Sequence, residues 1–457
     1  MRTLYPLAVA WEVRSLGDLC SGGDSSIQTG PFGSQLHASD YVEEGVPCVM
    51  PQDIRGGRVS TDSIARISEE DHARLKRFHL RKGDIIYPRR GDISKRALIE
   101  EREAGWLCGT GCLRIRPNTS VTDPKFLAYY LSHPDVCAWI EGNAVGATMP
   151  HLNTGLAGSV PVVCPPIEEQ RAIAATLGAL DDKIEVNRRM AATLEEMARA
   201  LYRSWFVDFD PVHAKAQGGA PAHMDPATAA LFPARFGDDG LPEGWRREAL
   251  QKHVRTAKGL SYKGKGLCES TEGLPLHNLN SIKVRGGYED AGIKFYREDF
   301  RERHLVRPGD LVVANTDLTL NEIVIGYAAL VPEHHGPRGL YSHHLYRVDF
   351  LETSPLSGAW LLFALNNSPL GQEIRGYANG TTVSMLPADA LQIPRVVVPP
   401  RDVIEAFDRQ VQPLMRRQGA TEEQNRTLAA LRDTLLPKLM SGELRVREAE
   451  AQVKEAV

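Results

Sequence analysis

The chain has 457 residues, of which 42% are hydrophobic and 25% charged, an ordinary composition for globular domains and enough for two to four separate cores. Its formal net charge of -4 argues against a protein that binds nucleic acid through bulk positive charge. No apolar run approaches membrane-spanning length, and residues 4–11 are too short and poorly flanked for a secretion signal. The seven cysteines are odd in number and irregularly spaced. We therefore expect a cytoplasmic protein without a disulfide framework.

Positive charge is concentrated in one stretch of the first half. Between residues 74 and 96 the basic side chains outnumber the acidic ones nine to two. A basic strip on an otherwise neutral body suits a DNA-binding subunit that also binds protein partners. The basic residues of the strip are Arg74, Lys76, Arg77, Arg81, Lys82, Arg89, Arg90, Lys95 and Arg96.

Several short stretches recur in the two halves of the chain. Residues 11–16 are echoed by residues 245–250 at an offset of 234 (245 minus 11), and the same offset relates the two Pro-Pro pairs that end each half's Val-rich segment. In both halves, at residues 81–86 and 307–312, a Gly-Asp turn precedes an apolar run and predicts a turn followed by a strand. The repeated spacing indicates an internally duplicated chain.

Each half is expected to contain mixed strand and helix, then a Val-rich strand, then a long helix. The Val-rich strands are predicted at residues 160–163 and 393–398, where prolines end them. An Asp-Pro pair at residues 123–124 predicts the start of a helix that continues through Trp139. Residues 210–240 are rich in Ala, Pro, Gly and Asp, which predicts a linker.

The longest predicted element is a helix over residues 168–206. Its core positions recur at alternating steps of four and three, a heptad seam typical of a helix packed along another helix. Asn187 is the polar member of this seam, and a buried Asn there weakens packing but fixes register and partner. The seam comprises Ile173, Leu177, Leu180, Ile184, Asn187, Ala191, Leu194, Ala198, Leu201 and Trp205.

A second seam near the end of the chain supplies a matching partner. Its polar member, Asn425, opens a stretch similar to the one that begins at Asn187. Two like helices, each after its own globular region, favour pairing with each other; the alternative is that each helix packs only on its own domain, which fits seams of this length less well. The second seam comprises Ile404, Phe407, Val411, Leu414, Asn425, Leu428, Leu431, Leu435 and Leu439.

A set of motifs accompanies the repeat. They are Thr-Gly-Pro-Phe-Gly-Ser-Gln-Leu at 29–36, Pro-Pro-Ile-Glu-Glu-Gln at 165–170, Leu-Asp-Asp-Lys-Ile-Glu at 180–185, Ser-Trp-Phe-Val-Asp-Phe at 204–209 and Leu-Leu-Pro-Lys-Leu-Met-Ser-Gly-Glu at 435–443. Over nearly the whole chain, this set resembles the specificity (S) subunit of type I restriction–modification systems. The second half departs from the family's commonest loop, because Gly-Leu-Ser-Tyr-Lys-Gly-Lys-Gly at 259–266 replaces Gly-Pro-Phe-Gly-Ser.

The resemblance implies an α+β fold of two duplicated mixed α/β target recognition domains, separated by two long helices that form an antiparallel coiled coil with a pseudo-two-fold axis. A helix of roughly 37 residues spans about 55 Å, and such a ruler can hold two readers about one DNA turn (~34–36 Å) apart. We therefore expect an asymmetric target of two blocks separated by a fixed gap. The expected segments are 1–165 for the first domain, 166–209 for the first spacer helix, 210–242 for the linker, 243–398 for the second domain, 399–445 for the second spacer helix and 446–457 for a flexible tail.

Candidate DNA-binding residues are polar side chains in Gly/Pro-punctuated segments, where binding groups are usually carried. Arg or Lys would suit guanine, and Asn or Gln adenine. For any single candidate, a solvated loop side chain is the alternative. The candidates are Ser34, Gln35, Gln52, Arg55, Arg89, Arg90, Lys95, Thr148 and His151 in the first half, and Lys258, Tyr262, Lys263, Lys265, Asn278, Asn280, Asn315, Asn321, Thr381 and Thr382 in the second.

Catalytic and metal-binding motifs are missing from the sequence. There is no Gly-rich phosphate or dinucleotide loop, and the segment at 210–213 lacks the second proline and aromatic of an amino-methyltransferase motif. Asp181 and Asp182 could imitate the metal-binding acids of a nuclease, but surface charge on a helix is the better interpretation. No metal site is expected at the His pairs 334–335 and 343–344, because nothing acidic or thiol stands at ligand spacing. Cys108 and Cys112 have no second pair and are interpreted as buried residues.

These features favour a non-catalytic, sequence-specific DNA-binding subunit. From the resemblance, its partners are double-stranded DNA, two modification (methyltransferase) subunits and restriction/translocase subunits. No cofactor is expected on this chain, because S-adenosylmethionine, ATP and Mg would be used by the partner subunits. One alternative is a coiled-coil scaffold protein that bridges partners without reading DNA, and another is an enzyme with both activities in one chain. The basic strip and the polar loops disfavour the first, and the absent motifs disfavour the second.

Overall fold

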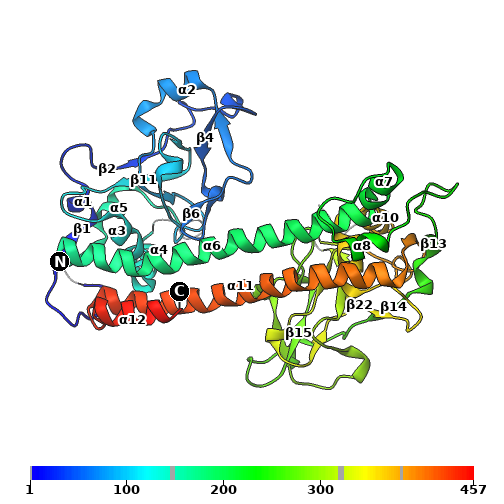
Figure 1. Ribbon diagram of the computed structural model, residues 1–457. Coiled ribbons are helices and arrows are strands. Elements are labelled where there is room, and N and C mark those ends of the chain that lie inside the picture. The colour runs from blue at the N-terminus through cyan, green and yellow to red at the C-terminus, as the bar shows by residue number, and fades with distance from the viewer. Residues whose placement is uncertain (1–2, 145–149, 318–323, 381–383, 457) are drawn as a thin grey trace. The chain divides into compact units, whose positions relative to one another are not determined.

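The computed structural model describes residues 3–144, 150–317, 324–380 and 384–456 (Figure 1). The chain divides into two compact units: unit 1 comprises residues 1–186 and 424–457, and unit 2 comprises residues 187–423. No helix within the described ranges is both long enough and apolar enough to cross a membrane.

Unit 1 is built on two small four-stranded sheets and a two-stranded ribbon. The antiparallel sheet has the order β2-β11-β8-β9, the mixed sheet has the order β10-β4-β7-β3 with β10 parallel to β4, and β1 pairs antiparallel with β12. The strands are β1 (Glu12–Ser15), β2 (Ser26–Thr29), β3 (Tyr41–Val42), β4 (Val46–Val49), β7 (Ala65–Ile67), β8 (Ile85–Pro88), β9 (Ala97–Leu98), β10 (Leu107–Cys108), β11 (Cys112–Arg116) and β12 (Pro161–Cys164), with a small hairpin of β5 (Ile54–Arg55) and β6 (Arg58–Val59).

Unit 2 repeats this arrangement. Its antiparallel sheet has the order β14-β22-β18-β20, its mixed sheet has the order β16-β15-β21-β17 with β15 parallel to β21, and β13 pairs antiparallel with β24. The strands are β13 (Arg246–Ala249), β14 (Val254–Lys258), β15 (Leu274–His277), β16 (Lys294–Tyr296), β17 (Leu305–Val306), β18 (Leu311–Ala314), β20 (Ala328–Leu330), β21 (Gly339–Tyr341), β22 (Leu345–Phe350) and β24 (Arg395–Val398), with a two-stranded pair of β19 (Thr316–Asp317) and β23 (Ser384–Met385).

The predicted duplication is confirmed by this topology and by local detail. In each unit the strand after the repeated tryptophan pairs with the Val-rich strand, as β1 with β12 and β13 with β24. The repeated Gly-Asp turns also match: Gly83 and Gly309 have φ values of +87° and +86°, which glycine adopts at little steric cost. In both turns the Asp side chain accepts a backbone N–H three residues earlier at 2.8 Å, in unit 1 from Arg81 to Asp84.

Short helices cover the sheets. They are α1 (Leu16–Leu19), α2 (Glu69–Arg74), α3 (Pro124–Tyr130), α4 (Pro134–Asn143) and α5 (Thr154–Ser159) in unit 1, and α7 (Asp210–Ala216), α8 (Pro226–Ala230), α9 (Gly358–Asn367) and α10 (Pro369–Arg375) in unit 2. Asp123 caps α3 as predicted, accepting the Phe126 N–H at 2.8 Å. The single helix predicted to continue through Trp139 is wrong, because Pro134 begins a separate helix that His133 caps.

Two long helices contribute to both units. They are α6 (Ile167–Phe206) and α11 (Arg401–Ser441), and their predicted seams are confirmed: Leu177, Leu180, Leu428 and Leu435 lie in the core of unit 1 with at most 1% of their surface exposed. In unit 2 the ring of Phe407 packs at 6.1 Å from that of Tyr202. Within each unit the two helix segments run antiparallel (Figure 1).

A polar cluster also joins the helices of unit 1. Asp181 on α6 accepts the Tyr129 hydroxyl of α3 at 2.5 Å and the Arg432 guanidinium of α11 at 2.7 Å. The interpretation of Asp181 as surface charge is therefore wrong. It is an ion-pair partner that ties three helices together.

Two segments that the sequence left without regular structure are helical. Residues 210–242 hold α7 and α8, and Val212 and Phe232 from this stretch are buried in the unit 2 core, so it is not an extended linker. Pro226 is the first residue of α8 and Pro211 the second of α7, positions in the first turn where the backbone N–H has no partner within the helix in any case. The flexible tail predicted for residues 446–457 is wrong for 446–456, which form α12 (Val446–Ala456) and bury Ala449 and Val453 in unit 1.

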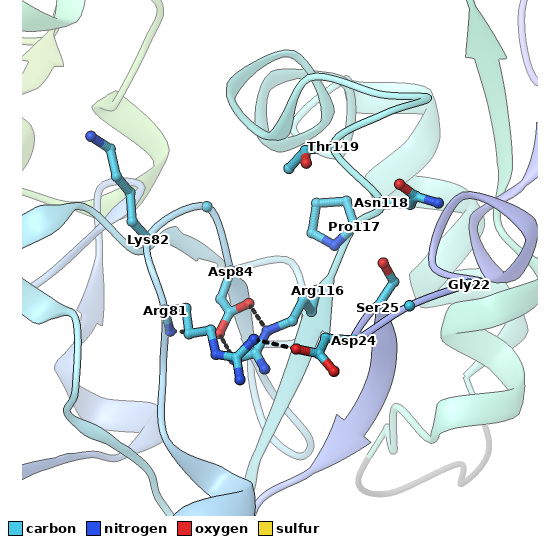
Figure 2. Close-up of a pocket in the computed structure, with 12 residues that line it drawn as sticks. Gly22, Asp24, Ser25, Arg81, Lys82, Asp84, Arg116, Pro117, Asn118 and Thr119 are labelled. Atoms are coloured by element: carbon cyan, nitrogen blue, oxygen red, sulfur yellow. Dashed lines mark hydrogen bonds and ion pairs between the residues drawn. The ribbon is translucent and has the colours of Figure 1, made fainter.

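The carboxylate of Asp84 supports a stability prediction for unit 1. It is 1% exposed and accepts the Arg116 guanidinium at 2.6 and 2.7 Å (Figure 2). Asp84→Ala leaves the guanidinium of Arg116, which is 13% exposed, without its carboxylate and, among the described residues, with only the His79 carbonyl as a partner. We therefore expect the free energy of unfolding to fall by about 3–5 kcal/mol. Lys82→Ala removes a neighbouring, exposed ion pair with Glu101 at 3.4 Å and is expected to cost at most about 1 kcal/mol. Urea denaturation of the full chain measures both, and equal losses would contradict a role for burial.

Candidate nucleic-acid interface

The loop that follows β2 in unit 1 is held against neighbouring backbone by a glycine. Gly30 donates its N–H to the Cys112 carbonyl at 2.9 Å, and a Cβ at Gly30 would lie 2.0 Å from the carbonyl oxygen of Gly109. Only a residue without a side chain fits this close approach. Gly33, three residues further on, faces open space. The loop is therefore fixed at its first residue, and Phe32 and Ser34 beyond it are exposed.

Three segments of unit 1 converge at this loop. The ring of Phe32 is 54% exposed and lies 5.9 Å from the Arg89 guanidinium. Gln35 folds back, its side-chain carbonyl accepting the Phe32 N–H at 3.2 Å. Arg89 Nη2 donates to His151 Nε2 at 3.1 Å, and Arg90 pairs with His151 through a backbone bridge. An exposed aromatic ring beside guanidinium and amide groups can contact both base edges and phosphates.

The protonation state of His151 fits this arrangement. Burial, with the positive charges of Arg89 and Arg90, lowers the pKa of His151. The neutral ring therefore prevails, and its Nε2 can accept the bond from Arg89. The Nε atom of Arg89 is buried without a hydrogen-bond partner among the described residues. Orphaned buried donors are uncommon and call for a partner.

The remaining unit 1 candidates are placed differently. Ser34 is exposed in the same loop, whereas Gln52 and Arg55 are exposed in a separate turn, where Arg55 Nε donates to the Gln52 carbonyl at 3.1 Å. Lys95 forms an exposed ion pair with Asp92 at 3.2 Å. Thr148 lies outside the described residues. The convergent set is thus Ser34, Gln35, Arg89, Arg90 and His151, with Phe32 as a member that a search for polar side chains missed.

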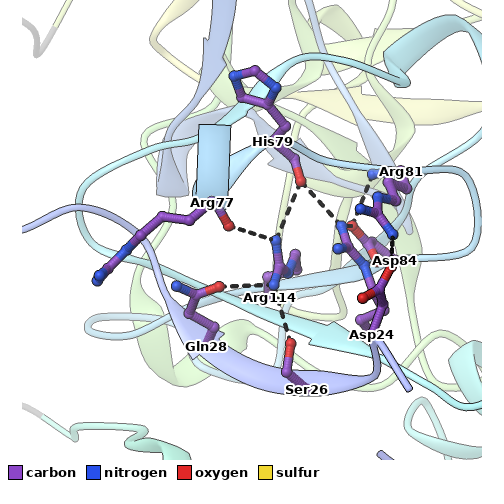
Figure 3. A network of polar contacts seen from close by, with 9 residues as sticks. Asp24, Ser26, Gln28, Arg77, His79, Arg81, Asp84 and Arg114 are labelled. Carbon is purple, nitrogen blue, oxygen red and sulfur yellow. Dashed lines mark hydrogen bonds and ion pairs between the residues drawn. The ribbon is translucent and has the colours of Figure 1, made fainter. Parts of the chain in front are cut away.

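Much of the basic strip serves the fold of unit 1. Arg114 on β11 is buried and donates to the carbonyls of Arg77 and His79 and to the side chains of Ser26 and Gln28 (Figure 3). These bonds hold the backbone of the strip on the sheet. Several strip side chains are occupied by partners in the described structure: Arg74 by Asp71, Arg81 by Asp24, Lys82 by Glu101, and Arg96 by the Ala128 carbonyl. Arg90 is exposed and forms no ion pair with another described residue.

A polar cavity of about 390 Å³ lies beside this strip (Figure 2). Arg81 and Arg116 line it, but each is paired with a carboxylate, Asp24 at 3.0 Å and Asp84 at 2.6 Å. The cavity therefore presents neutralised pairs rather than an unpaired guanidinium. We assign it no ligand.

Unit 2 has an equivalent glycine contact. A Cβ at Gly259 would lie 2.2 Å from the Ser342 carbonyl oxygen, and the backbone of Leu260 bonds to that of Tyr341 at 2.7 Å and of His343 at 2.9 Å. Beyond it, Tyr262 accepts a hydrogen bond from Lys294 at 3.1 Å, and its ring lies 6.4 Å from that of His343. The loop side chains here are tyrosine and lysine where unit 1 has phenylalanine and glutamine.

The other candidate DNA-binding residues of unit 2 fall into an exposed group and a buried group. Lys258, Lys263, Lys265 and Asn280 are exposed, and Lys265 pairs with Glu298 at 3.4 Å. Two candidates are corrected: Asn278 and Asn315 are only 5% and 1% exposed, and their side-chain N–H groups donate to the carbonyls of Gly292 and His343. Both are structural and do not reach the surface. Asn321, Thr381 and Thr382 lie outside the described residues. The structure adds His343 and His344, whose neighbouring rings the sequence analysis considered only for metal.

The two seam asparagines are both placed on the helices as expected. Asn187 is 1% exposed, and Asn425 donates to the Ile184 carbonyl at 3.3 Å within unit 1. Their role in fixing register stays a prediction.

Comparisons with known proteins bear on this arrangement. Residues 8–196 match the family model described as the type I restriction modification DNA specificity domain. The chain is 22% identical to the type I restriction enzyme MjaIX specificity subunit of Methanocaldococcus jannaschii over 96% of this chain and 93% of that protein. It is 23% identical to the HindI specificity subunit of Haemophilus influenzae over 80% of this chain and 87% of that protein.

A solved structure shares the fold. The type I restriction–modification S subunit from M. genitalium superposes with a TM-score of 0.56 at 15% identity, covering 94% of this chain and 96% of that one. This likeness confirms the fold class expected from the sequence motifs. The matching family model and the two similar specificity subunits support the resemblance itself.

The contrast between two glycines of one loop gives a test of the unit 1 surface. Gly30→Ala places a methyl group against the Gly109 carbonyl, so the loop must shift, at a cost of about 1–3 kcal/mol, and DNA binding through this unit should weaken. Gly33→Ala adds the same methyl group into open space and is expected to leave both properties unchanged. Urea denaturation and DNA titration of the purified variants measure the difference. Equal behaviour would show that the loop does not depend on its glycine contact.

Proposed function

Because residues 8–196 match the type I restriction modification DNA specificity domain, we propose that this chain is the DNA-reading specificity subunit of such a system. It has no catalytic role of its own. Each unit reads one short block of base pairs through its glycine-anchored loop and the segments that converge on it.

The observation that carries this proposal is that both units have the same close contact between a glycine and a backbone carbonyl, followed by loops with different side chains. Gly30 in unit 1 and Gly259 in unit 2 make the same close approach to a carbonyl at the end of an equivalent sheet. The loops that follow present Phe32, Ser34 and Gln35 in one unit and Tyr262, Lys263 and Lys265 in the other. Two copies of a fold with unlike contact groups suit the reading of two unlike blocks.

The contact chemistry differs accordingly. In unit 1, Arg90 and Arg89 supply guanidinium donors that suit guanine or phosphate, and Gln35 supplies an amide that suits adenine. In unit 2, Lys258, Lys263 and Lys265 supply point charges, which position a protein on phosphates and reach guanine acceptors. The two blocks should therefore differ in sequence, and the complete site should be asymmetric.

The helices supply the spacing in this proposal. α6 and α11 contain 40 and 41 residues, lengths of about 60 Å at 1.5 Å per residue. Their packed seams make them stiff, so the gap between the two blocks would be constant. Outward surfaces of the helices would recruit two modification subunits and the restriction subunits, and S-adenosylmethionine, ATP and Mg would act in those partners.

Paired charge removals test the division between the units. Arg89→Ala with Arg90→Ala is expected to weaken discrimination at one block by about 1–3 kcal/mol per lost base contact and to leave the other block unchanged. Lys263→Ala with Lys265→Ala is expected to affect the opposite block. Binding of the assembled complex to DNA duplexes altered in either block measures this, at one fixed salt concentration because phosphate contacts make affinity salt-dependent.

Each double variant is the matched control for the other, since both remove two positive charges. If both variants weakened recognition of the same block, separate readers would be excluded. If neither variant changed binding to any duplex, the coiled-coil scaffold would become the better reading of the chain.

Matched insertions test the spacing. Four residues added after Val186 in α6 and four after Glu423 in α11 lengthen each helix by about 6 Å. Because one base pair rises about 3.4 Å, the gap in the preferred site should grow by one or two base pairs. Mapping methylated positions in the host genome measures the gap. As the control, four residues inserted between Gly218 and Gly219, in the segment that joins α7 and α8, should leave the gap unchanged. An unchanged gap in the helix variant would show that the helices do not set the spacing.

A further inference from the structure

Two adjacent histidines of unit 2 meet a carboxylate that is far away in sequence. His334 Nε2 lies 2.5 Å and His335 Nε2 lies 2.9 Å from the same oxygen, Oδ1 of Asp290. The three side chains form the one group of potential metal ligands found among the described residues. We propose that Asp290, His334 and His335 form a binding site for a divalent transition metal ion, for which Zn²⁺ is the best-suited ion.

The distances fit such an ion after small movements. The three ligand atoms lie within 4.8 Å of one another. Zinc bonds of about 2.0–2.1 Å in a tetrahedron put neighbouring ligand atoms about 3.3 Å apart, a value between the 2.5 Å contact and the 4.8 Å limit. Side-chain rotations alone can therefore open the hydrogen-bonded cluster around an ion. Each ring would bind the ion through an Nε2 that carries no proton, and the remaining imidazole proton would lie on Nδ1.

The donor set selects the class of metal. Two imidazole nitrogens and one carboxylate oxygen suit Zn²⁺ and its neighbours in the first transition row, whereas Ca²⁺ and Mg²⁺ prefer oxygen alone. Three protein ligands leave a fourth position for water or for another group. The side chains are 28% exposed at His334, 14% at His335 and 26% at Asp290, so an ion from solvent can reach them.

The nearest histidine outside the cluster is His277 on β15. It is 1% exposed, its ring lies 5.7 Å from that of His335, and its Nδ1 contacts the Tyr288 hydroxyl at 2.5 Å. Because Tyr288 already occupies this nitrogen, His277 is not counted among the ligands.

An ion at this position would join two short turns of unit 2. Asp290 begins the 3-10 turn Asp290–Gly292, and the histidines end the turn Glu333–His335. These turns precede β16 and β21, which both pair with β15 in the mixed sheet. A metal would thus cross-link the sheet of unit 2 and stabilise it against unfolding. No metal site was expected here, because no acid stands at ligand spacing in the sequence. The fold brings Asp290 to the histidines from a distant segment.

Titration of Zn²⁺ into the metal-free full chain tests this site, which does not depend on the proposed function. We expect one saturable Zn²⁺ per chain and a higher unfolding temperature for unit 2 with the ion bound, since a ligand of the folded state stabilises it. His334→Gln with His335→Gln, and separately Asp290→Asn, should weaken Zn²⁺ binding by at least about tenfold and abolish the shift in unfolding temperature.

The control is the other adjacent histidine pair of unit 2. The rings of His343 and His344 lie 3.9 Å apart and are tilted, and His344 bonds to Thr316 instead of to a carboxylate. His343→Gln with His344→Gln should bind Zn²⁺ as the unmodified chain does. Co²⁺ in place of Zn²⁺ should give a spectrum of nitrogen and oxygen ligands. The proposal is overturned by the absence of saturable binding, by equal losses in both histidine variants, or by a sulfur-to-cobalt absorption that places the ion on cysteines.

Discussion

The cores of both units depend on antiparallel packing between helix segments that are distant in sequence. In unit 1, Leu177 and Leu435 share one core, and Asp181 receives hydrogen bonds from α3 and α11 together. In unit 2, Phe407 closes an aromatic cluster around Tyr202. Unit 1 is made of two separate stretches of chain, 1–186 and 424–457, and the continuous stretch 187–423 of unit 2 contains segments of both α6 and α11. The recognition surfaces are therefore carried by folds that exist only once both long helices are in place.

A second constraint acts at the start of each recognition loop, where one residue must be glycine while the side chains after it can vary. Each loop must start with a glycine, because a Cβ at that position would lie 2.0 or 2.2 Å from a backbone carbonyl oxygen and would displace the backbone. The positions after it, such as Phe32 and Tyr262, lie outside that contact and carry no such restriction. Contact groups can therefore change from one unit to the other while the strand order of the antiparallel sheet stays the same.

The sequence predicted features whose signals are local or periodic. Heptad seams, Gly-Asp turns and Pro-Pro strand ends all follow from neighbouring residues, and the structure contains them. Burial of polar residues was not predictable in the same way. Asn278 resembles any other loop asparagine, and only the fold brings the Gly292 carbonyl to its amide. Asp290 and His334 are likewise joined by strand pairing across a long separation. The helix at the end of the chain could have been predicted from the sequence, because Val446, Ala449 and Val453 are spaced three and four residues apart.

An early segment and a late segment of the described chain pack together in unit 1. The backbone N–H of Ala8 donates to the Ser441 carbonyl at 2.8 Å, the Tyr5 hydroxyl donates to the Met440 carbonyl, and α12 buries Val453 in the same core. The path of the chain thus leaves unit 1 along α6, passes through unit 2 and returns to unit 1 along α11. An early and a late segment of the chain therefore close the same core, so a change that loosens one of them should also loosen the packing of the other.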